Sequence, residues 1–277
     1  KKEIVFEVKA GQTVQNVIDS LESENLISNK FYFQIYSKLN AFDTILAGKY
    51  LIKPGANFKE IIESLKIPQI LTIKLPFYEG LRIDEIADKI DAQIEDQIKD
   101  KSTIKFSKTE FLEIANNPSS FLDHELLKII PEGKTLEGIL YPDTYIFEKE
   151  ATTKEIILKL LDTFNEKLTL AKVNSSLTPG VYTDYELVTL ASIVEKEGTG
   201  IYEDNANIAD VFFKRLQGLN GAKLLQSDVV LLYELKNWKA VLTFYDLENK
   251  NYEYNTHVKE GLPPGPICSI GLNSLKA

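Results

Sequence analysis

Residues 183–198 read TDYELVTLASIVEKEG and predict a helix that ends on two closely spaced glutamates. Thr183 and Glu186 have the spacing of a capping box, which is typical of a helix start. Gly198 favours an end directly after the second glutamate, because glycine is common where helices stop. The stretch therefore predicts one helix with a defined start and a defined end.

The two glutamates, Glu195 and Glu197, lie on the two borders of the apolar face when residues are placed about 100° apart. Lys196 points to the side opposite that face. A carboxylate at the C-terminal end of a helix faces the negative end of the helix dipole, and a neighbouring carboxylate adds like charge. Both effects favour the uncharged acid that a proton donor near neutral pH requires. The alternative is a charged last turn on an ordinary surface helix.

Strand and helix patterns also occur at the start of the chain. Residues 4–8 and 48–52 read as strands, and residues 14–21 and 31–39 repeat apolar side chains with a helical period. Thr13 is a predicted N-cap, and Asn57 is another for a helix over residues 58–65. The order strand, helix, helix, strand predicts a small βααβ lobe in which the first and last strands pair.

The remaining chain alternates between strand and helix signals. Residues 70–75 read as a strand, 136–145 as a structured loop that leads into a strand, and 153–168 as a long amphipathic helix. After the quoted helix the pattern is largely helical as far as Asn255, then loop-like, with a last helix starting at Asn273 or Ser274. The whole pattern predicts an α+β fold, with a small βααβ lobe followed by a mixed, helix-rich lobe.

The composition excludes several classes of function. The 277 residues carry a formal net charge of −9, so the chain lacks the positive charge that drives nucleic-acid binding, and no nucleic-acid partner is expected. One cysteine and two histidines argue against a His/Cys metal site, and we expect neither a metal nor a cofactor. No apolar run approaches the ~18 residues that span a membrane. A sugar chain is compatible with this composition.

Several short segments resemble motifs of the YceG-like family, the endolytic murein transglycosylases. They are residues 136–138 (LEG), 141–145 (YPDTY), 191–197 (ASIVEKE), 211–216 (VFFKRL), 225–228 (LQSD), 254–256 (YNT), 261–267 (GLPPGPI) and 274–277 (SLKA). Their common order over residues 136–277 makes the resemblance specific. The chain departs from the family at Val229 and Val230, where Pro-Thr is usual, at Lys214, which is often Asn, and at His257, which is commonly Tyr.

The resemblance implies the domains and the location. Residues 1–68 resemble the LysM-like subdomain of the family, and residues 69–277 resemble its catalytic domain, whose C-terminal part we expect to be missing here. The family is held by one N-terminal helix to the outer face of the bacterial cytoplasmic membrane, so we expect such an anchor ahead of this chain. The expected partners are peptidoglycan glycan strands and the glycan polymerases or penicillin-binding proteins beside them.

The resemblance also implies the reaction, which is non-hydrolytic cleavage of the β-1,4 bond between N-acetylmuramic acid and N-acetylglucosamine, ending nascent strands. One carboxylic acid protonates the glycosidic oxygen, and the 6-hydroxyl of the muramic residue replaces water and leaves a 1,6-anhydro end. This scheme differs from that of glycosidases with two catalytic carboxylates. Glu197 matches the catalytic glutamate of the family, and Glu195 is the alternative acid or a structural neighbour.

Eight further residues are predicted to bind the substrate. They are Glu137, Tyr141, Asp143, Arg215, Gln226, Asp228, Asn255 and Thr256. Their polar groups can hydrogen-bond to sugar hydroxyls, tyrosine offers a flat face to a sugar ring, and an arginine can bind a carboxylate through two hydrogen bonds. For Glu137 and Asp143 the alternative is hydrogen bonds that fix a loop, and for Arg215 it is an ion pair on a helix surface.

Two other functions are compatible with the same residues. The first is a peptidoglycan-binding or scaffold module of the wall-synthesis machinery without activity, and retention of both Glu195 and Glu197 counts against it. The second is a hydrolytic muramidase, which would leave a reducing end in place of an anhydro end. A serine or cysteine hydrolase is disfavoured, because neither histidine lies in a recognisable catalytic setting.

Overall fold

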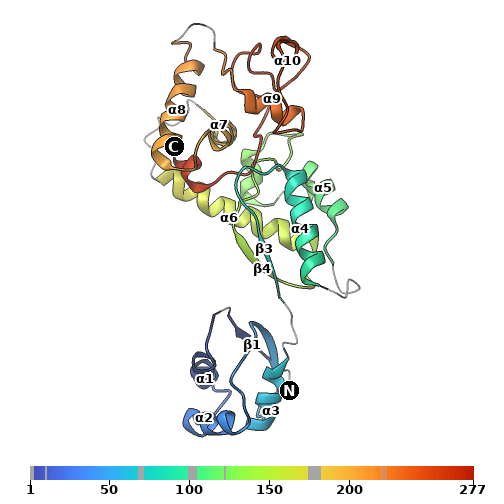
Figure 1. Ribbon diagram of the computed structural model, residues 1–277, viewed down its shortest axis with the longest axis vertical. Coiled ribbons are helices and arrows are strands. Elements are labelled where there is room, and N and C mark those ends of the chain that lie inside the picture. Colours follow the sequence, from blue (N-terminus) through green and yellow to red (C-terminus); the bar gives the residue numbers. More distant parts are fainter. Residues whose placement is uncertain are drawn as a thin grey trace. The chain divides into compact units, whose positions relative to one another are not determined.

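The computed structural model describes residues 3–9, 11–67, 72–98, 105–121, 123–173, 182–219, 221 and 223–277. Within these residues the chain forms two compact units. Unit 1 comprises the described residues up to 74 together with 146–150, and unit 2 comprises 75–98, 105–145 and 151–277 without the gaps named above. Helices occur together with two small sheets of two strands each, so the predicted α+β class is confirmed (Figure 1).

Unit 1 is built around one antiparallel pair of strands. β1 (Ile4–Val8) pairs with β2 (Gly48–Ile52), with Phe6 opposite Tyr50. The helices α1 (Val14–Ser23) and α2 (Lys30–Leu39) lie between the strands in the sequence, and α3 (Phe58–Lys66) follows them. The first and last strands of the predicted βααβ lobe therefore do pair, while its likeness to LysM stays a prediction.

Local sequence signals begin the helices of unit 1 where they were predicted. The Thr13 side chain accepts a hydrogen bond from the N–H of Asn16, and the Asn57 side chain accepts one from the N–H of Glu60. The apolar faces of these helices then form one core with the inner side of the sheet. Its buried members include Phe6, Val17, Leu21, Phe33, Tyr50, Ile61 and Leu65.

Unit 2 is mostly helical. The elements after α3 are β3 (Thr72–Pro76), α4 (Ile83–Gln97), α5 (Lys108–Asn116), two 3-10 helices (Pro118–Phe121 and Glu125–Ile129), β4 (Thr144–Glu148), α6 (Thr153–Val173), α7 (Asp184–Glu197), α8 (Tyr202–Leu216), α9 (Asp228–Glu234), α10 (Phe244–Glu248) and α11 (Leu272–Lys276). The boundary between the two units falls within β3 and within β4, and the helices of this list belong to unit 2. β3 pairs with β4. The predicted strand over residues 70–75 corresponds to β3, and residues 70 and 71 lie outside the described part of the chain.

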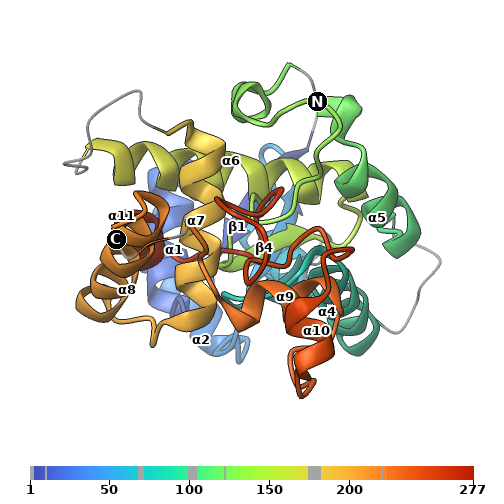
Figure 2. The same cartoon turned by 90° about the horizontal axis from the view of Figure 1, so that it is seen from above.

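Four helices pack together at one end of unit 2. α11 contacts α6, α7 and α8, and α7 also contacts α8 (Figure 2). The last helix starts at Leu272, slightly before the predicted Asn273 or Ser274. The largely helical pattern predicted before Asn255 was too generous, because the described residues between α8 and α9 (217–219, 221 and 223–227) and between α9 and α10 (235–243) are not helical. The chain turns at the positive-φ residues Gly218 and Lys236 in these loops.

The buried segment Ile267–Ile270 runs through the middle of unit 2. On one side, the Ile267 N–H donates to Ser192 Oγ on α7 at 3.0 Å. On the other side, Ser269 exchanges backbone hydrogen bonds with the loop ahead of α4, donating to Leu81 O at 2.7 Å and accepting from Gly80 N–H at 2.8 Å. This segment therefore holds α7 and the loop around residues 78–82 on its two sides, although they are distant in the sequence.

Candidate active site

α7 crosses the interior of unit 2 and emerges at its C-terminal end. Its start has the predicted capping box, in which the Thr183 N–H donates to Glu186 Oε2 at 2.7 Å and the Glu186 N–H donates to Thr183 Oγ1 at 3.2 Å. Residues 188–194 are buried all around the helix, including Thr189 and Ser192, which exceeds the single apolar face that was predicted. Beyond this buried stretch the last turn, residues 195–197, reaches the surface again, so its side chains can meet a ligand.

The three residues of that last turn point in three directions, because consecutive residues of a helix are about 100° apart. Glu195 and Lys196 are half-buried, whereas Glu197 is exposed. Glu195 and Glu197 therefore do not face the same space. A glycosidase with two catalytic carboxylates needs both on one bond, so these two glutamates do not make such a pair.

Glu195 connects α7 to the start of α11. Its Oε2 accepts a hydrogen bond from the Gly271 N–H at 2.9 Å and another from Ser274 Oγ at 2.6 Å. The predicted ligand residue Tyr141 lines the same open hollow, together with Glu79. Tyr141 is buried, and this burial raises the pKa of its hydroxyl to about 12. Two donors on one oxygen give Glu195 the role of a structural anchor for residues 271–274.

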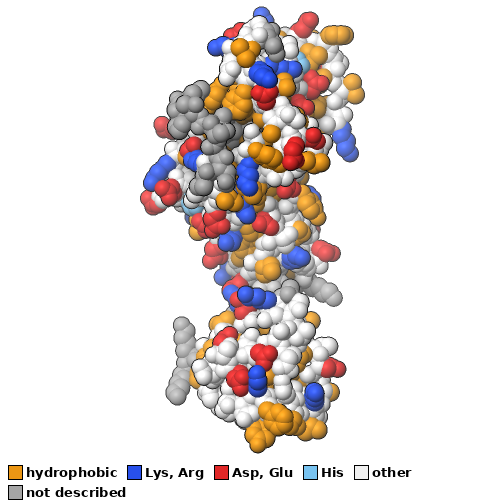
Figure 3. Space-filling view, turned by 90° about the vertical axis from the view of Figure 1, so that its left-hand side faces the viewer, with side chains coloured by type: hydrophobic (Ala, Val, Ile, Leu, Met, Phe, Trp, Pro, Cys, Tyr) orange, Lys and Arg blue, Asp and Glu red, His pale blue; other side chains and the backbone are white. Residues whose placement is uncertain are grey.

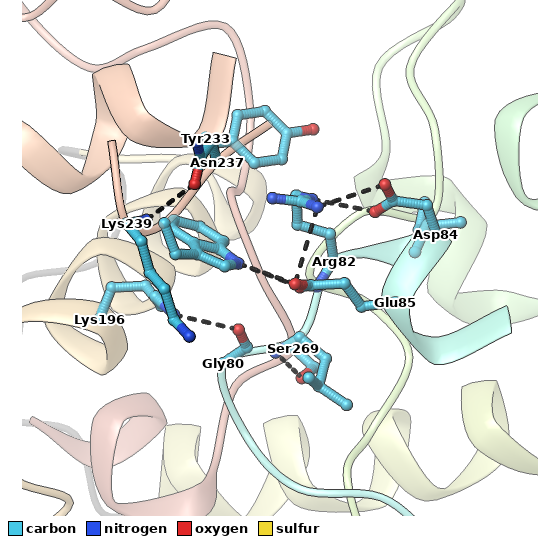
Figure 4. A network of polar contacts seen from close by, with 12 residues as sticks. Gly80, Arg82, Asp84, Glu85, Lys196, Tyr233, Asn237, Lys239 and Ser269 are labelled. Atoms are coloured by element: carbon cyan, nitrogen blue, oxygen red, sulfur yellow. Dashed lines mark hydrogen bonds and ion pairs between the residues drawn. The ribbon is translucent and has the colours of Figure 1, made fainter. Parts of the chain in front are cut away.

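Lys196 lies against Trp238, the only tryptophan of the chain. Figure 4 shows Lys196 together with Gly80, Arg82 and Glu85. Its Nζ is 3.8 Å from the centroid of the Trp238 ring and 3.3 Å from the carbonyl oxygen of Gly80. The Trp238 indole N–H donates to the Glu85 carboxylate at 3.1 Å, and the Arg82 guanidinium lies 5.3 Å from the ring centroid. Cation–π contacts of this kind fix the long lysine side chain, and so connect the end of α7 to the loop after α9.

Glu197 has one hydrogen-bond partner among the described residues. Its Oε1 accepts from the hydroxyl of Ser227 at 2.7 Å, and Ser227 is buried. Neighbouring residues hold Ser227 firmly in turn. Its N–H donates to Thr256 Oγ1 at 3.1 Å, and that hydroxyl donates to Ser227 O at 3.3 Å. The exposed carboxyl of Glu197 is thus held at one oxygen by a fixed hydroxyl, which leaves its other oxygen for a ligand.

Two of the predicted ligand residues, Arg215 and Gln226, help to fix the backbone around Ser227. The Arg215 guanidinium on α8 donates to the carbonyl of Leu225, and the Gln226 N–H donates to Thr256 O at 3.0 Å. Residues 225–228 are therefore fixed between α8 and residue 256. This contact uses one nitrogen of the Arg215 guanidinium, and the two predicted roles, carboxylate binding and a surface ion pair, stay predictions.

Asn255 extends the same support to α10. It is fully buried, and its Nδ2 donates to the carbonyls of Asp246 at 3.0 Å, Leu247 at 3.1 Å and Asn249 at 2.9 Å. These carbonyls lie at the end of α10, where backbone acceptors lack partners within the helix. The polar atoms of Asn255 and Thr256 thus form hydrogen bonds within the protein, although both residues line a hollow beside the 261–264 loop.

The side chains available to a ligand lie around Glu197. Gln226 and Asp228 flank the buried Ser227 and are exposed. Asp228 Oδ1 lies 3.0 Å from His257 Nε2. Asp143 is also exposed, but it lies ahead of β4, where its carboxylate accepts from the N–H of Thr144 at 2.7 Å. The structure therefore gathers Arg215, Gln226, Asp228, Asn255 and Thr256 in or beside residues 225–228, the segment that carries the Ser227 partner of Glu197, and it places Asp143, Tyr141 and Glu137 elsewhere.

Glu137 occupies a separate, buried position. Its carboxylate accepts from the Ile83 N–H at the start of α4 at 3.2 Å and from the hydroxyl of Tyr233 at 3.2 Å. Burial raises the pKa of this carboxyl to about 8, and burial likewise raises the pKa of Tyr233. The Glu137 carboxyl thus ties its own loop to α4 and α9. These contacts match the predicted alternative in which Glu137 fixes a loop by hydrogen bonds.

Glu137 makes the stability of unit 2 depend on pH. The folded pKa of about 8 lies above the ordinary value of 4.5, so the folded protein binds this proton more tightly than the unfolded chain does. The free energy of unfolding is therefore expected to fall as the pH rises from 4.5 towards 8. Glu137→Gln keeps the shape and an acceptor oxygen, so we expect it to be more stable than the parent above pH 8 by at least about 1 kcal/mol. Guanidinium unfolding of both proteins across this range measures the difference, and identical pH profiles would contradict the prediction.

Five residues at these positions were not identified from the sequence as site residues. They are Glu79, Arg82, Lys196, Ser227 and Trp238. Ser227 had a usable signal, because it lies between two predicted ligand residues in the LQSD motif. Trp238 and Arg82 carried none, since they belong to no recognised segment. Among the described residues, no group of three or more His, Cys, Asp or Glu side chains could hold a metal ion, and no helix is long and apolar enough to cross a membrane.

Comparisons with known proteins agree over nearly the whole chain. The model of the YceG-like family matches residues 6–277. A protein of Streptococcus pneumoniae R6 named endolytic murein transglycosylase is 28% identical over 298 residues, which cover 100% of this chain and 52% of that protein. A Bacillus subtilis 168 protein of the same name is 28% identical over 291 residues, which cover 100% of this chain and 75% of that protein. The chain thus spans about half the length of the pneumococcal relative.

A crystal structure of a YceG-like protein from Listeria monocytogenes has the same fold. It superposes with a TM-score of 0.59 at 28% identity, and the match covers 100% of this chain and 88% of that one.

Proposed function

The chain belongs to the YceG-like family, and from this premise we propose that it cleaves peptidoglycan glycan strands internally as a lytic transglycosylase, with Glu197 as its acid. The relatives named endolytic murein transglycosylase support the reaction class. The observation that carries the assignment of the acid is the exposed Glu197 carboxyl, held at one oxygen by the buried Ser227 hydroxyl. Hydrogen bonds join three segments here: Glu197 at the end of α7 bonds to residues 225–228, and these bond to Thr256.

In the proposed mechanism Glu197 acts first as an acid and then as a base. Its protonated carboxyl donates to the oxygen of the β-1,4 bond, and the bond from that oxygen to C1 of the muramic residue breaks. The departing N-acetylglucosamine keeps the proton on its 4-hydroxyl, and positive charge develops at C1. The 6-hydroxyl of the muramic residue then attacks C1 and gives its proton to the Glu197 carboxylate. The product is a 1,6-anhydro end, and the acid is restored without water.

Ser227 supports both stages of this cycle. Its hydroxyl donates to Oε1, which directs the other oxygen of Glu197 towards the substrate and stabilises the carboxylate after proton transfer. Gln226 and Asp228, exposed on either side of it, are placed to hydrogen-bond to sugar hydroxyls. Arg215, Asn255 and Thr256 serve as positioning residues for this segment, since their polar groups hold its backbone and that of α10.

The product identifies the reaction directly. Uncross-linked glycan strands are incubated with the protein, and the fragments are analysed by mass spectrometry. Internal fragments that end in 1,6-anhydro-N-acetylmuramic acid are expected. Reducing ends in their place would establish a hydrolytic muramidase. Intact strands that are nevertheless retained by the protein would favour the binding-module alternative.

Removing the Ser227 hydroxyl tests its role. Ser227→Ala is expected to lower kcat by about tenfold or more at an unchanged KM, because a hydrogen bond to a charged group contributes about 1.5–3 kcal/mol. Ser227→Thr, which keeps the hydroxyl, should recover most of the activity. The matched control is Ser274→Ala, which removes the equivalent hydroxyl donor from Glu195. A larger loss of kcat in the control than in Ser227→Ala would move the catalytic role to Glu195.

The location is part of the same proposal. We propose that the protein works at the outer face of the bacterial cytoplasmic membrane beside the glycan polymerases, with unit 1 as a LysM-like, glycan-holding lobe. The support for this is the family to which the chain belongs. The chain is expected to capture a penicillin-binding protein from solubilised membranes. A chain without unit 1 is expected to fail to do so. The comparison tests the partner and the role of unit 1 together.

A further inference from the structure

The outer face of α2 in unit 1 is apolar and exposed. Phe31, Tyr32, Ile35 and Leu39 fall within an arc of about 100° around the helix. Their exposed fractions are 62%, 63%, 44% and 79%. The rings of Phe31 and Tyr32 meet edge to face with centroids 5.8 Å apart. Figure 3 shows hydrophobic side chains gathered at the end of unit 1 where Figure 1 places α2. We refer to these four residues as the α2 stripe.

The opposite face of the same helix already has its partner. Phe33 and Ser37 are buried in the core of unit 1. A helix that is apolar on two opposite faces is normally covered on both. Core packing explains the inner face alone, and contiguous exposed apolar side chains mark an interaction site. The α2 stripe therefore calls for a partner outside unit 1.

The charge of α2 differs from that of the chain. Its ten residues include Lys30 and Lys38 and no carboxylate, whereas the chain carries a net charge of −9. Lys38 lies on the helical wheel next to the edge of the stripe. Lys30 pairs with Asp19 at 3.3 Å and Glu22 at 3.6 Å, so Lys38 is the cation available to a ligand on this face. A basic edge beside an apolar stripe is complementary to a surface with negative head groups and an apolar layer beneath.

The size of the stripe argues against a second copy of the chain as its partner. A helix of ten residues is about 15 Å long, whereas a stable interface needs about 800 Å² from each partner. A glycan would use the two aromatic rings, but Ile35 and Leu39 offer it no hydrogen bond. A lipid layer requires neither a large complementary surface nor hydrogen-bonding groups.

We propose that the α2 stripe binds the surface of an anionic lipid bilayer. The four side chains enter the boundary between head groups and acyl chains, and Lys38 meets the anionic head groups. This contact is independent of the proposed catalytic function, because the stripe belongs to unit 1 and Glu197 to unit 2. It would hold unit 1 at the membrane surface by its own side chains.

Co-sedimentation with vesicles tests the proposal on the whole chain. The protein is expected to bind vesicles of phosphatidylglycerol and phosphatidylcholine, and to bind pure phosphatidylcholine vesicles more weakly. Phe31→Ser combined with Leu39→Ser should lower the partition coefficient by about tenfold or more, since two large apolar side chains would no longer leave water on binding. Lys38→Glu should weaken binding to the anionic vesicles and leave binding to the neutral ones unchanged.

The matched control removes an apolar pair from unit 2 that is more exposed than Phe31 and Leu39. Val241 and Phe244 are 90% and 83% exposed, and Val241→Ser combined with Phe244→Ser should leave vesicle binding unchanged. Circular dichroism establishes that each variant is folded. An equal loss in the control would overturn the proposal. A parent protein that does not bind vesicles would also overturn it. In that case, loss of self-association by the α2 variant in sedimentation velocity would identify a second copy as the partner, and loss of binding to soluble glycan fragments would identify a glycan.

Discussion

Replacing Glu197 by glutamine is expected to abolish strand cleavage, with a fall in kcat of about a thousandfold, because general acid–base catalysis contributes about 10²–10⁴. Glutamine keeps the shape of the side chain and can still accept the Ser227 hydrogen bond, but it cannot donate a proton to the glycosidic oxygen. The melting temperature should not change, since Glu197 is exposed. Counting anhydro ends by mass spectrometry over time gives the two rates.

The matched control is the same substitution two residues earlier. In Glu195→Gln the amide oxygen can still accept from the Gly271 N–H and from Ser274 Oγ, so the anchor to residues 271–274 survives. We expect its kcat to stay within about tenfold of the parent. Full activity in the Glu197 variant, with loss of activity in the Glu195 variant, would reverse the assignment. Equal loss in both would indicate that the whole last turn acts as a unit.

Gly138→Ala is expected to have the largest effect on stability. Gly138 has a φ of +74°, a conformation that side chains other than glycine rarely adopt. A Cβ at this position would lie 2.3 Å from Cβ of Pro266 and 3.2 Å from the carbonyl oxygen of Cys268. The rigid proline ring cannot turn away, so one of the two segments must move. We expect a loss of about 3 kcal/mol or more, which chemical unfolding measures.

Gly133→Ala separates the two contributions to that loss. Gly133 has nearly the same φ, +76°, but no atom lies within 4 Å of its ideal Cβ position. This variant carries the backbone strain without the collision, and it should lose only about 1–2 kcal/mol. Similar losses in the two variants would show that Pro266 yields easily. A larger loss in Gly138→Ala would establish tight packing between the 136–138 segment and the 261–267 loop.

The features that the sequence predicted well are those with local causes. The N-caps at Thr13, Asn57 and Thr183 each depend on a side chain and a backbone N–H three residues apart. α7 also ends at Glu197, directly before Gly198, as predicted. The order of strands and helices in unit 1 follows from hydrophobic periods within single segments. Such signals lie within a few residues and can be recognised without knowing the rest of the fold.

The features that escaped prediction depend on distant segments. Ser192 is buried on the side of α7 expected to be polar, because the Ile267 N–H donates to its hydroxyl. The contact of Lys196 with Trp238 joins residues 42 positions apart, and Trp238 lies in a loop without any motif. The resemblance to a family did identify Glu197 and its neighbours in the LQSD and YNT segments, and the hydrogen bonds among them give that grouping a physical basis. The roles of these residues in catalysis stay predictions.

The central position of Ile267–Ile270 has a consequence for how the protein is made. The hydrogen bond from the Leu81 N–H to Ser269 Oγ joins residues 188 positions apart, and such pairing is slow because a long loop must close first. During synthesis, unit 1 has both strands of its sheet once residue 52 has left the ribosome. The core of unit 2 cannot close before residues 267–270 have been synthesised. The nascent protein therefore passes through a stage with one folded lobe and an exposed, unfinished one, during which chaperones have the most to protect.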